Sequence, residues 1–247
     1  MKLDEWLRRY DMLRAKFGYS VVEDQNAAML LSELLEGKNL DLKVLTNLIS
    51  SKNILVIGAG PSLENNLSKI SSLKQFTIIA ADGTSQALLE SSVKPDIVVT
   101  DLDGSHEHLL QSDKIGSIMV VHAHADNVDL MRNLVPKMKN CIGTTQVKPL
   151  HNVYNFGGFT DGDRAVFLAS EFKARNIVLV GMDFGEKIGR YSKIKVKDEK
   201  QKIAKMAVGK ELLEWLSTFY AAKLYNASPS VISGFKNIDF EEIISIT

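Results

Sequence analysis

The stretch Asn53-Ile54-Leu55-Val56-Ile57-Gly58-Ala59-Gly60-Pro61-Ser62 has the pattern of a buried strand that ends in a tight glycine turn. A continuous, largely β-branched apolar run indicates a strand covered on both faces, which is typical of parallel sheets. Similar short runs follow, with helical patterns between them, at residues 77–80, 97–100, 118–121 and 177–180. We therefore predict a doubly wound, mainly parallel α/β sheet in a domain at residues 51–186.

Helical patterns lie on both sides of this domain. Apolar residues recur at three- and four-residue intervals through the first fifty positions, so we predict an N-terminal helical region at residues 1–50. Residues 187–247 are expected to form a basic segment followed by a C-terminal helix. The predicted buried side of that helix is Leu212, Leu213, Leu216, Phe219, Tyr220 and Leu224.

Composition excludes several classes of protein. The 247 residues contain 30 Lys plus Arg and 30 Asp plus Glu, and this zero net charge is not typical of a dedicated nucleic-acid binder. The apolar runs are far shorter than the ~18 residues of a membrane span, and the first residues do not resemble a signal peptide. With a single cysteine, Cys141, the sequence predicts a cytoplasmic protein without nucleic-acid or membrane partners. It leaves homo-oligomer formation open.

Aspartates gather where the predicted strands end. Ligands of open parallel sheets bind beyond the carboxyl ends of the strands, because loops and helix N-termini meet there. Crowded carboxylates repel one another unless a cation neutralises them, and oxygen ligands suit Mg²⁺ better than zinc. The residues in these positions are Asp82, Asp101, Asp103, Asp126, Asp161, Asp163 and Asp183.

The turn Gly58-x-Gly60-Pro61-Ser62 could hold phosphate on free N–H groups at the start of a helix. The alternative is a plain strand-to-helix turn. The third glycine of a dinucleotide-binding fingerprint is missing, yet Asp82, followed by Gly83, could still contact a ribose. A nicotinamide or flavin enzyme therefore remains among the candidates.

Asp101-x-Asp103 places two carboxylates on one side of an extended segment, a spacing suited to sharing Mg²⁺. The alternative is that Asp101 caps the following helix. The segment His122-x-His124-x-Asp126 is similar to metallo-hydrolase ligands but lacks a histidine at Asn127, which argues against a dinuclear zinc site. It belongs either to the catalytic rim or to a set of buried polar residues under a loop.

Two further segments could contact phosphate. The glycine-rich segment 157–164 ends in Arg164, which could grip phosphate bidentately, while Asp161 or Asp163 accepts hydrogen bonds or completes a metal shell. Its alternative is a capping turn with an Asp–Arg surface pair. Residues 187–210 carry nine basic and two acidic residues. They form either a solvated face or a flap that closes over polyphosphate through lysines such as Lys193 and Lys195.

Five motifs together resemble those of the archaeal MptE-like 6-hydroxymethyl-7,8-dihydropterin pyrophosphokinases. They are Gly-Ala-Gly-Pro-Ser-Leu at 58–63, Ala-Asp-Gly at 81–83, Pro-Asp-Ile-Val-Val-Thr-Asp-Leu-Asp-Gly at 95–104, His-Ala-His-Ala-Asp-Asn at 122–127 and Gly-Gly-Phe-Thr-Asp-Gly-Asp-Arg-Ala at 157–165. The Asp-Gly and Asp-Leu-Asp elements also look like those of thiamin pyrophosphokinases. In thiamin pyrophosphokinases the second element more often ends in serine, whereas here it ends in Gly104.

The resemblance implies transfer of diphosphate from ATP to a reduced pterin, with AMP as the second product, in methanopterin-type or folate-type cofactor synthesis. It implies that Asp82, Asp101 and Asp103 bind Mg²⁺ and that the Gly58–Ser62 turn cradles phosphate. Arg164 or basic-segment lysines would stabilise developing charge. Asp126 or His124 would orient the hydroxyl, and Asp161 would read the amino edge of the pterin.

Two other functions fit parts of this pattern. Asp-x-Asp also binds metal–diphosphate in nucleotide-sugar glycosyltransferases, and flagellin-glycosylation factors carry a related domain. A non-catalytic nucleotide-binding module could use the same cleft without turnover.

Overall fold

A single nine-stranded parallel sheet forms the centre of the computed structural model, which describes residues 1–192 and 198–246. Within these residues the strand order is β6-β5-β4-β3-β2-β1-β7-β8-β9. The strands are β1 (Asn53–Ile57), β2 (Phe76–Ala81), β3 (Ile97–Thr100), β4 (Ile118–Ala123), β5 (Cys141–Thr145), β6 (Val153–Tyr154), β7 (Asn176–Val180), β8 (Lys223–Asn226) and β9 (Lys236–Asn237). The predicted α/β fold with a parallel sheet is confirmed.

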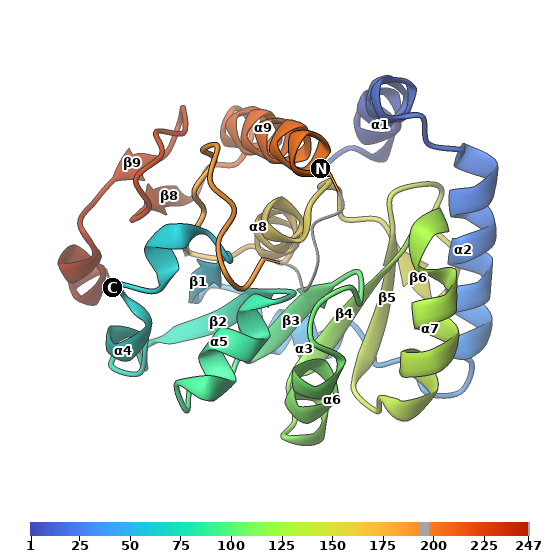
Figure 1. The fold of residues 1–247 in the computed structure, drawn as a ribbon, viewed down its shortest axis with the longest axis horizontal. Coiled ribbons are helices and arrows are strands. Elements are labelled where there is room, and N and C mark those ends of the chain that lie inside the picture. The colour runs from blue at the N-terminus through green and yellow to red at the C-terminus, as the bar shows by residue number, and fades with distance from the viewer. Residues whose placement is uncertain (193–197, 247) are drawn as a thin grey trace.

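Helices connect the strands and cover both faces of the sheet (Figure 1). The α-helices are α1 (Leu3–Phe17), α2 (Val21–Leu34), α3 (Lys43–Ile49), α4 (Leu67–Ile70), α5 (Thr84–Glu90), α6 (His106–Lys114), α7 (Val128–Leu134), α8 (Asp161–Glu171) and α9 (Glu199–Ser217). Short 3₁₀ helices lie at η1 (Pro61–Leu63), η2 (Ala125–Asn127), η3 (Val135–Lys137) and η4 (Phe240–Ser245). None of the helices within 1–192 and 198–246 is both long and apolar enough to span a membrane.

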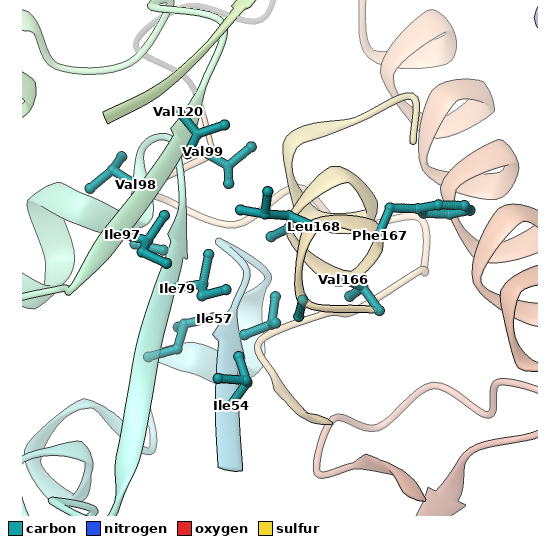
Figure 2. Packing of buried hydrophobic residues seen from close by; sticks show 14 of the residues in the cluster. Ile54, Ile57, Ile79, Ile97, Val98, Val99, Val120, Val166, Phe167 and Leu168 are labelled. Atoms are coloured by element: carbon teal, nitrogen blue, oxygen red, sulfur yellow. The ribbon is translucent and has the colours of Figure 1, made fainter. Parts of the chain in front are cut away.

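Helix α8 packs on the central strands β1, β2 and β3. Figure 2 shows Val99 pointing toward α8 while the neighbouring Val98 points to the other face, as the two-residue period of a strand requires. Leu168 faces the sheet, whereas Phe167 points away from it and lies 5.9 Å from the ring of Trp215 in α9. Helix α8 is therefore held between the sheet and α9, which fixes the position of its first turn.

The N-terminal region is helical, as predicted, and its first helix packs against α8. Trp6 and Tyr10 of α1 are completely or almost completely buried, and the Trp6 ring lies 6.3 Å from Phe167. Helix α1 ends at Phe17, and the next residue, Gly18, has a φ of 75° that suits a left-handed cap.

The predicted C-terminal helix is shorter than expected. Leu212, Leu213 and Leu216 are buried in α9, but the helix ends at Ser217, and Phe219 is exposed. Leu224, which we expected on this helix, lies instead in β8 and pairs with β7. The prediction is wrong here because the edge of β7 takes up the backbone of 223–226, and those hydrogen bonds outweigh a continued helical pattern.

Candidate active site

A cleft of about 650 Å³ opens at the carboxyl edge of the sheet. It lies over the strand-order reversal, where β1 stands between β2 and β7 and the connections leave in opposite directions. Within the described residues, seven carboxylates and four cationic side chains line it: Asp82, Asp101, Asp103, Asp126, Asp161, Asp183 and Asp198, with Arg164, Lys187, Lys202 and Lys205. A volume of this size fits the usual range of pockets for small molecules.

The structure brings Asp82, Asp101 and Asp103 together. One carboxylate oxygen from each lies within 4.8 Å of the other two, so the three side chains could share one metal ion. Asp82 follows β2 and is buried, whereas Asp101 and Asp103 follow β3 and are partly exposed to the cleft. Their ligand atoms are all oxygen, which suits Mg²⁺.

The backbone after β2 and β3 is shaped around this cluster. Asp82 and Leu102 have φ values of +36° and +72°, in the region that residues other than glycine rarely adopt. Thr100 donates its hydroxyl proton to Asp82 Oδ1 and accepts the Leu102 N–H at 2.8 Å. One threonine thus ties the two loops together and fixes the Asp82 carboxylate.

Position 104 lies so close to Asp82 that only glycine fits there without a shift of the carboxylate. A Cβ at position 104 would lie 2.5 Å from Asp82 Oδ2, well inside van der Waals contact. A serine at this position, the residue more often found in thiamin pyrophosphokinases, would displace the Asp82 carboxylate.

His124 and Asn127 organise the loop after β4. Asp126 N–H donates to His124 Nδ1 at 3.2 Å, so in the neutral imidazole the proton lies on Nε2, which faces Asp101 Oδ2 at 3.4 Å. Asn127 donates to the backbone oxygens of Asp101 and His122 at 2.8 and 2.7 Å. The predicted rim residue His124 therefore orients Asp101, and Asn127 supplies the cross-strand link where a zinc site would need another histidine.

His122 differs from its neighbour. It is buried, and its Nδ1 pairs with Thr144 Oγ1 at 3.2 Å. Burial and the nearby charge of Arg164 hold its pKa well below the usual value, so the ring is neutral. The interpretation as a polar residue beneath the loop applies to this histidine.

Arg164 and Asp161 form a pair in the wall of the cleft. Arg164 donates from Nη1 to Asp161 Oδ1 and from Nη2 to Gln146 Oε1, each at 3.2 Å. Burial and, next, the charge of Asp101 raise the pKa of Asp161 well above its usual range, while Arg164 opposes this shift. Asp161 therefore feels the acidic cluster directly and belongs to the same group of charges.

Asp163 does not face the cleft, which corrects its predicted role. It is fully buried and accepts the N–H of Phe159 at 2.6 Å, the N–H of Thr160 at 2.7 Å and the Thr160 hydroxyl. These bonds satisfy donors at the start of α8, so the capping alternative is right for this residue.

The Gly58–Ser62 turn also differs from its prediction. Gly58 and Gly60 line the cleft, but their N–H groups donate to Val180 O and Gly181 O. Both the N–H and the hydroxyl of Ser62 donate to Asp183, at 2.6 and 2.7 Å. Pro61, Ser62 and Gly83 are not among the residues that line the cleft. The N–H groups of Gly58, Gly60 and Ser62, which we expected to cradle phosphate, are therefore occupied, because the end of β7 and the loop after it pack onto this turn.

Basic side chains reach the cleft from the C-terminal segment. Lys187, Lys202 and Lys205 line it, the last two from α9. Lys193 and Lys195, the predicted flap lysines, lie outside the described residues. Asp126 lies at the exposed rim of the cleft, with its Oδ2 atom 3.9 Å from His124 Nδ1.

An aromatic wall was missed by the sequence analysis. Tyr19 and Phe159 line the cleft with ring centroids 6.1 Å apart, and Phe17 lies behind them, 5.3 Å from Phe159. Lys205 Nζ lies 5.3 Å from the centre of the Tyr19 ring. Aromatic residues on both sides of Gly18 and within the glycine-rich segment were the available signal, but their convergence depends on how α1 packs.

The fold and the cleft define the class: a parallel α/β protein with a cluster of carboxylates of metal-binding type facing basic side chains. Residues 26–189 match the family model for MptE-like 6-hydroxymethylpterin diphosphokinases. The chain belongs to this family, as its motifs predicted.

Curated relatives named 6-hydroxymethyl-7,8-dihydropterin pyrophosphokinase match nearly the whole chain. The protein of Pyrococcus furiosus is 46% identical, over 92% of this chain and 100% of its own length. That of Methanothermobacter thermautotrophicus is 42% identical over 87% of this chain and 95% of its own, and that of Methanocaldococcus jannaschii is 39% identical over 87% and 96%.

A solved structure shares the fold at low identity. The Maf glycosyltransferase of Magnetospirillum magneticum aligns with a TM-score of 0.53 and 13% identity, over 84% of this chain and 38% of the glycosyltransferase. This likeness concerns the fold alone, because the identity is too low to carry an activity.

Proposed function

We propose that this protein transfers the terminal diphosphate of ATP to 6-hydroxymethyl-7,8-dihydropterin, in a reaction that depends on Mg²⁺ and belongs to tetrahydromethanopterin-type or folate-type cofactor synthesis. The names of three relatives at 39–46% identity support the pterin diphosphokinase activity. The observation that carries the chemistry is the convergence of Asp82, Asp101 and Asp103 in a cleft lined by lysines and an arginine.

The reaction needs positioning and charge neutralisation more than covalent chemistry. The hydroxymethyl oxygen bonds to the β-phosphorus, the bond from that phosphorus to the α,β-bridging oxygen breaks, and AMP leaves while the hydroxyl proton is lost. Mg²⁺ held by Asp82, Asp101 and Asp103 would neutralise phosphate charge and polarise the phosphoryl group. We assign the remaining neutralisation to Arg164, Lys202 and Lys205, which reach the cleft from α8 and α9.

We place the pterin against the aromatic wall. The side chains of Tyr19 and Phe159 line the cleft, where a planar heterocycle could pack against them. His124 lies beside Asp101, and Asp126 lies beside His124. Either Asp126 or His124 could orient the attacking hydroxyl. We choose Asp126, because the Nε2 atom of His124 already faces Asp101.

Asp161 fits a different role from the one its motif implied. The hydroxymethyl and amino groups lie at opposite ends of the pterin ring system. Burial and then the charges of Asp101 and Asp82 raise the pKa of Asp161, so this side chain stands near the carboxylate cluster, at the reacting end. We therefore propose Asp161 as the counter-ion of Arg164 rather than as the reader of the amino edge.

Product analysis separates the candidate functions. Incubation with ATP, Mg²⁺ and 6-hydroxymethyl-7,8-dihydropterin is expected to give AMP and pterin diphosphate in equal amounts by mass spectrometry, and chelation of the metal should stop both. ADP as the sole nucleotide product, or ATP binding without turnover, contradicts the proposal. Turnover of a nucleotide sugar instead would support the glycosyltransferase alternative.

A further inference from the structure

A buried polar network joins the N-terminal helices to the wall of the cleft. Its members are Tyr10 of α1, Asp24 of α2 and Gln146 directly after β5, all less than 5% exposed. The Tyr10 hydroxyl donates to Asp24 Oδ2, and Gln146 Nε2 donates to the same carboxylate oxygen at 2.9 Å and to the Tyr10 oxygen at 3.1 Å. Gln146 lies more than 100 positions from Tyr10 and Asp24 in sequence, and none of the three belongs to the motifs discussed above.

Asp24 decides which way the Gln146 amide points. An ionised carboxylate only accepts hydrogen bonds, so it takes the amide NH₂ and leaves the amide oxygen facing the other way. That oxygen accepts the Arg164 Nη2 proton at 3.2 Å. The Gln146 dipole is thus matched at both ends, with a carboxylate at its donor and a guanidinium at its acceptor.

The other oxygen of Asp24 holds the loop after β4. Asp24 Oδ1 accepts the Ala125 N–H at 2.9 Å, and Ala125 lies between His124 and Asp126. The backbone oxygen of Gln146 accepts the Trp6 indole N–H, also at 2.9 Å, so α1 fixes the main chain of Gln146 as well. A single buried carboxylate therefore contacts both sides of the cleft.

We propose that Asp24 is a positioning residue that, through Gln146, holds the Arg164 guanidinium toward the transferring phosphates. The consequence is that the N-terminal helices, which carry none of the metal or phosphate ligands, form part of the active site. The catalytic readout of this role rests on the proposed function, whereas the orientation of Arg164 can be measured without turnover.

The test exchanges the charge along the network. Asp24→Asn lets the Gln146 side-chain amide flip, so that it presents its NH₂ to the guanidinium. We therefore expect kcat to fall about 10- to 100-fold, with little change in the KM for pterin. Gln146→Glu alone sets two carboxylates against each other and should also lower kcat. The double variant Asp24→Asn/Gln146→Glu offers an amide donor to a carboxylate that accepts from Arg164, and it should regain most of the lost kcat.

Ser32→Ala is the matched control on the same helix. Ser32 is a buried polar residue of α2 that donates to Asn152 at 2.5 Å, away from the cleft. It should lower the melting temperature while leaving kcat unchanged. A loss of kcat in Ser32→Ala equal to that in Asp24→Asn would show a general effect of α2 and overturn the proposal.

The NMR signal of the Arg164 Nε–H group tests the orientation independently of activity. The signal, assigned by its absence in Arg164→Lys, should move or broaden in Asp24→Asn and return in the double variant. An identical Arg164 signal in all three proteins overturns the positioning role, as does a double variant slower than both single ones. A wild-type protein that makes no pterin diphosphate would instead refute the proposed function, and the NMR comparison would still decide the network.

Discussion

Gly104 shows how one missing side chain shapes the candidate metal site. The position lies against the Asp82 carboxylate, where an added Cβ would come within 2.5 Å of Oδ2. Because Asp82 is also held by Thr100, it can give way only by losing that hydrogen bond. The spacing of the three carboxylates thus depends on a residue that binds nothing itself.

We expect Gly104→Ala to lower diphosphate transfer by about 10- to 100-fold, because displacement of Asp82 weakens metal binding. Steady-state rates over a Mg²⁺ titration measure this as a higher metal requirement. Gly185→Ala is the matched control, because a Cβ there meets nothing within 4 Å. Equal Mg²⁺ dependence in the two variants would remove Asp82 from the metal site.

At the scale of the elements, α8 carries one acid that caps the helix and one that lines the cleft. Asp163 closes the first turn of the helix, whereas Asp161, two residues earlier, pairs with Arg164 in the cleft. The sequence pattern Thr160-x-x-Asp163 was a signal for capping, but the neighbouring carboxylates made the two acids look equivalent.

Asp163→Ala should therefore destabilise the fold rather than the chemistry. Loss of its hydrogen bonds leaves buried donors unsatisfied at the start of α8, at a cost of about 1–3 kcal/mol. Urea unfolding measures this cost, and the specific activity of the folded fraction at low temperature should stay close to wild type. A variant with unchanged stability and lost activity would return Asp163 to the catalytic group.

Helix α9 brings two lysines of the predicted basic segment to the cleft. Lys202 and Lys205 reach the cleft, whereas Lys200 is exposed and does not line it. Lys202→Ala and Lys205→Ala should each weaken ATP binding and reduce its dependence on salt, because fewer charges contact the phosphates. Calorimetric titration at two ionic strengths measures both effects. The same loss in Lys200→Ala would mean that only the overall charge of the helix matters.

For the whole molecule, the sequence predicted those strands and site residues that continuous stretches of the chain encode. Apolar runs revealed β1 to β4 and β7, and the residues that follow them led to Asp82, Asp101 and Asp103. Strands β5, β6, β8 and β9 were missed because they are short or mix polar with apolar residues. A sheet accepts such segments when an edge is available for pairing, whatever their own pattern.

The parts of the site that could not be predicted come from distant elements. Tyr19 reaches the cleft because α1 packs against α8, where Trp6 meets Phe167, and no local motif encodes that contact. Gln146 reaches it as the residue directly after β5, a strand that the apolar runs did not reveal. The N–H groups of Gly58, Gly60 and Ser62 are likewise occupied by residues 180–183, more than 100 positions away. Although the net charge of the chain is zero, the cleft is lined both by the acidic cluster and by Lys202 and Lys205 of α9.

Transfer of an intact diphosphate is the central claim, and isotope labelling tests it most directly. ATP carrying ¹⁸O on the nonbridging oxygens of both the β- and γ-phosphates is incubated with Mg²⁺ and 6-hydroxymethyl-7,8-dihydropterin, and the products are weighed by mass spectrometry. We expect all of the label in pterin diphosphate, with unlabelled AMP. Pterin monophosphate together with ADP, or labelled phosphate released without any pterin product, would contradict the account.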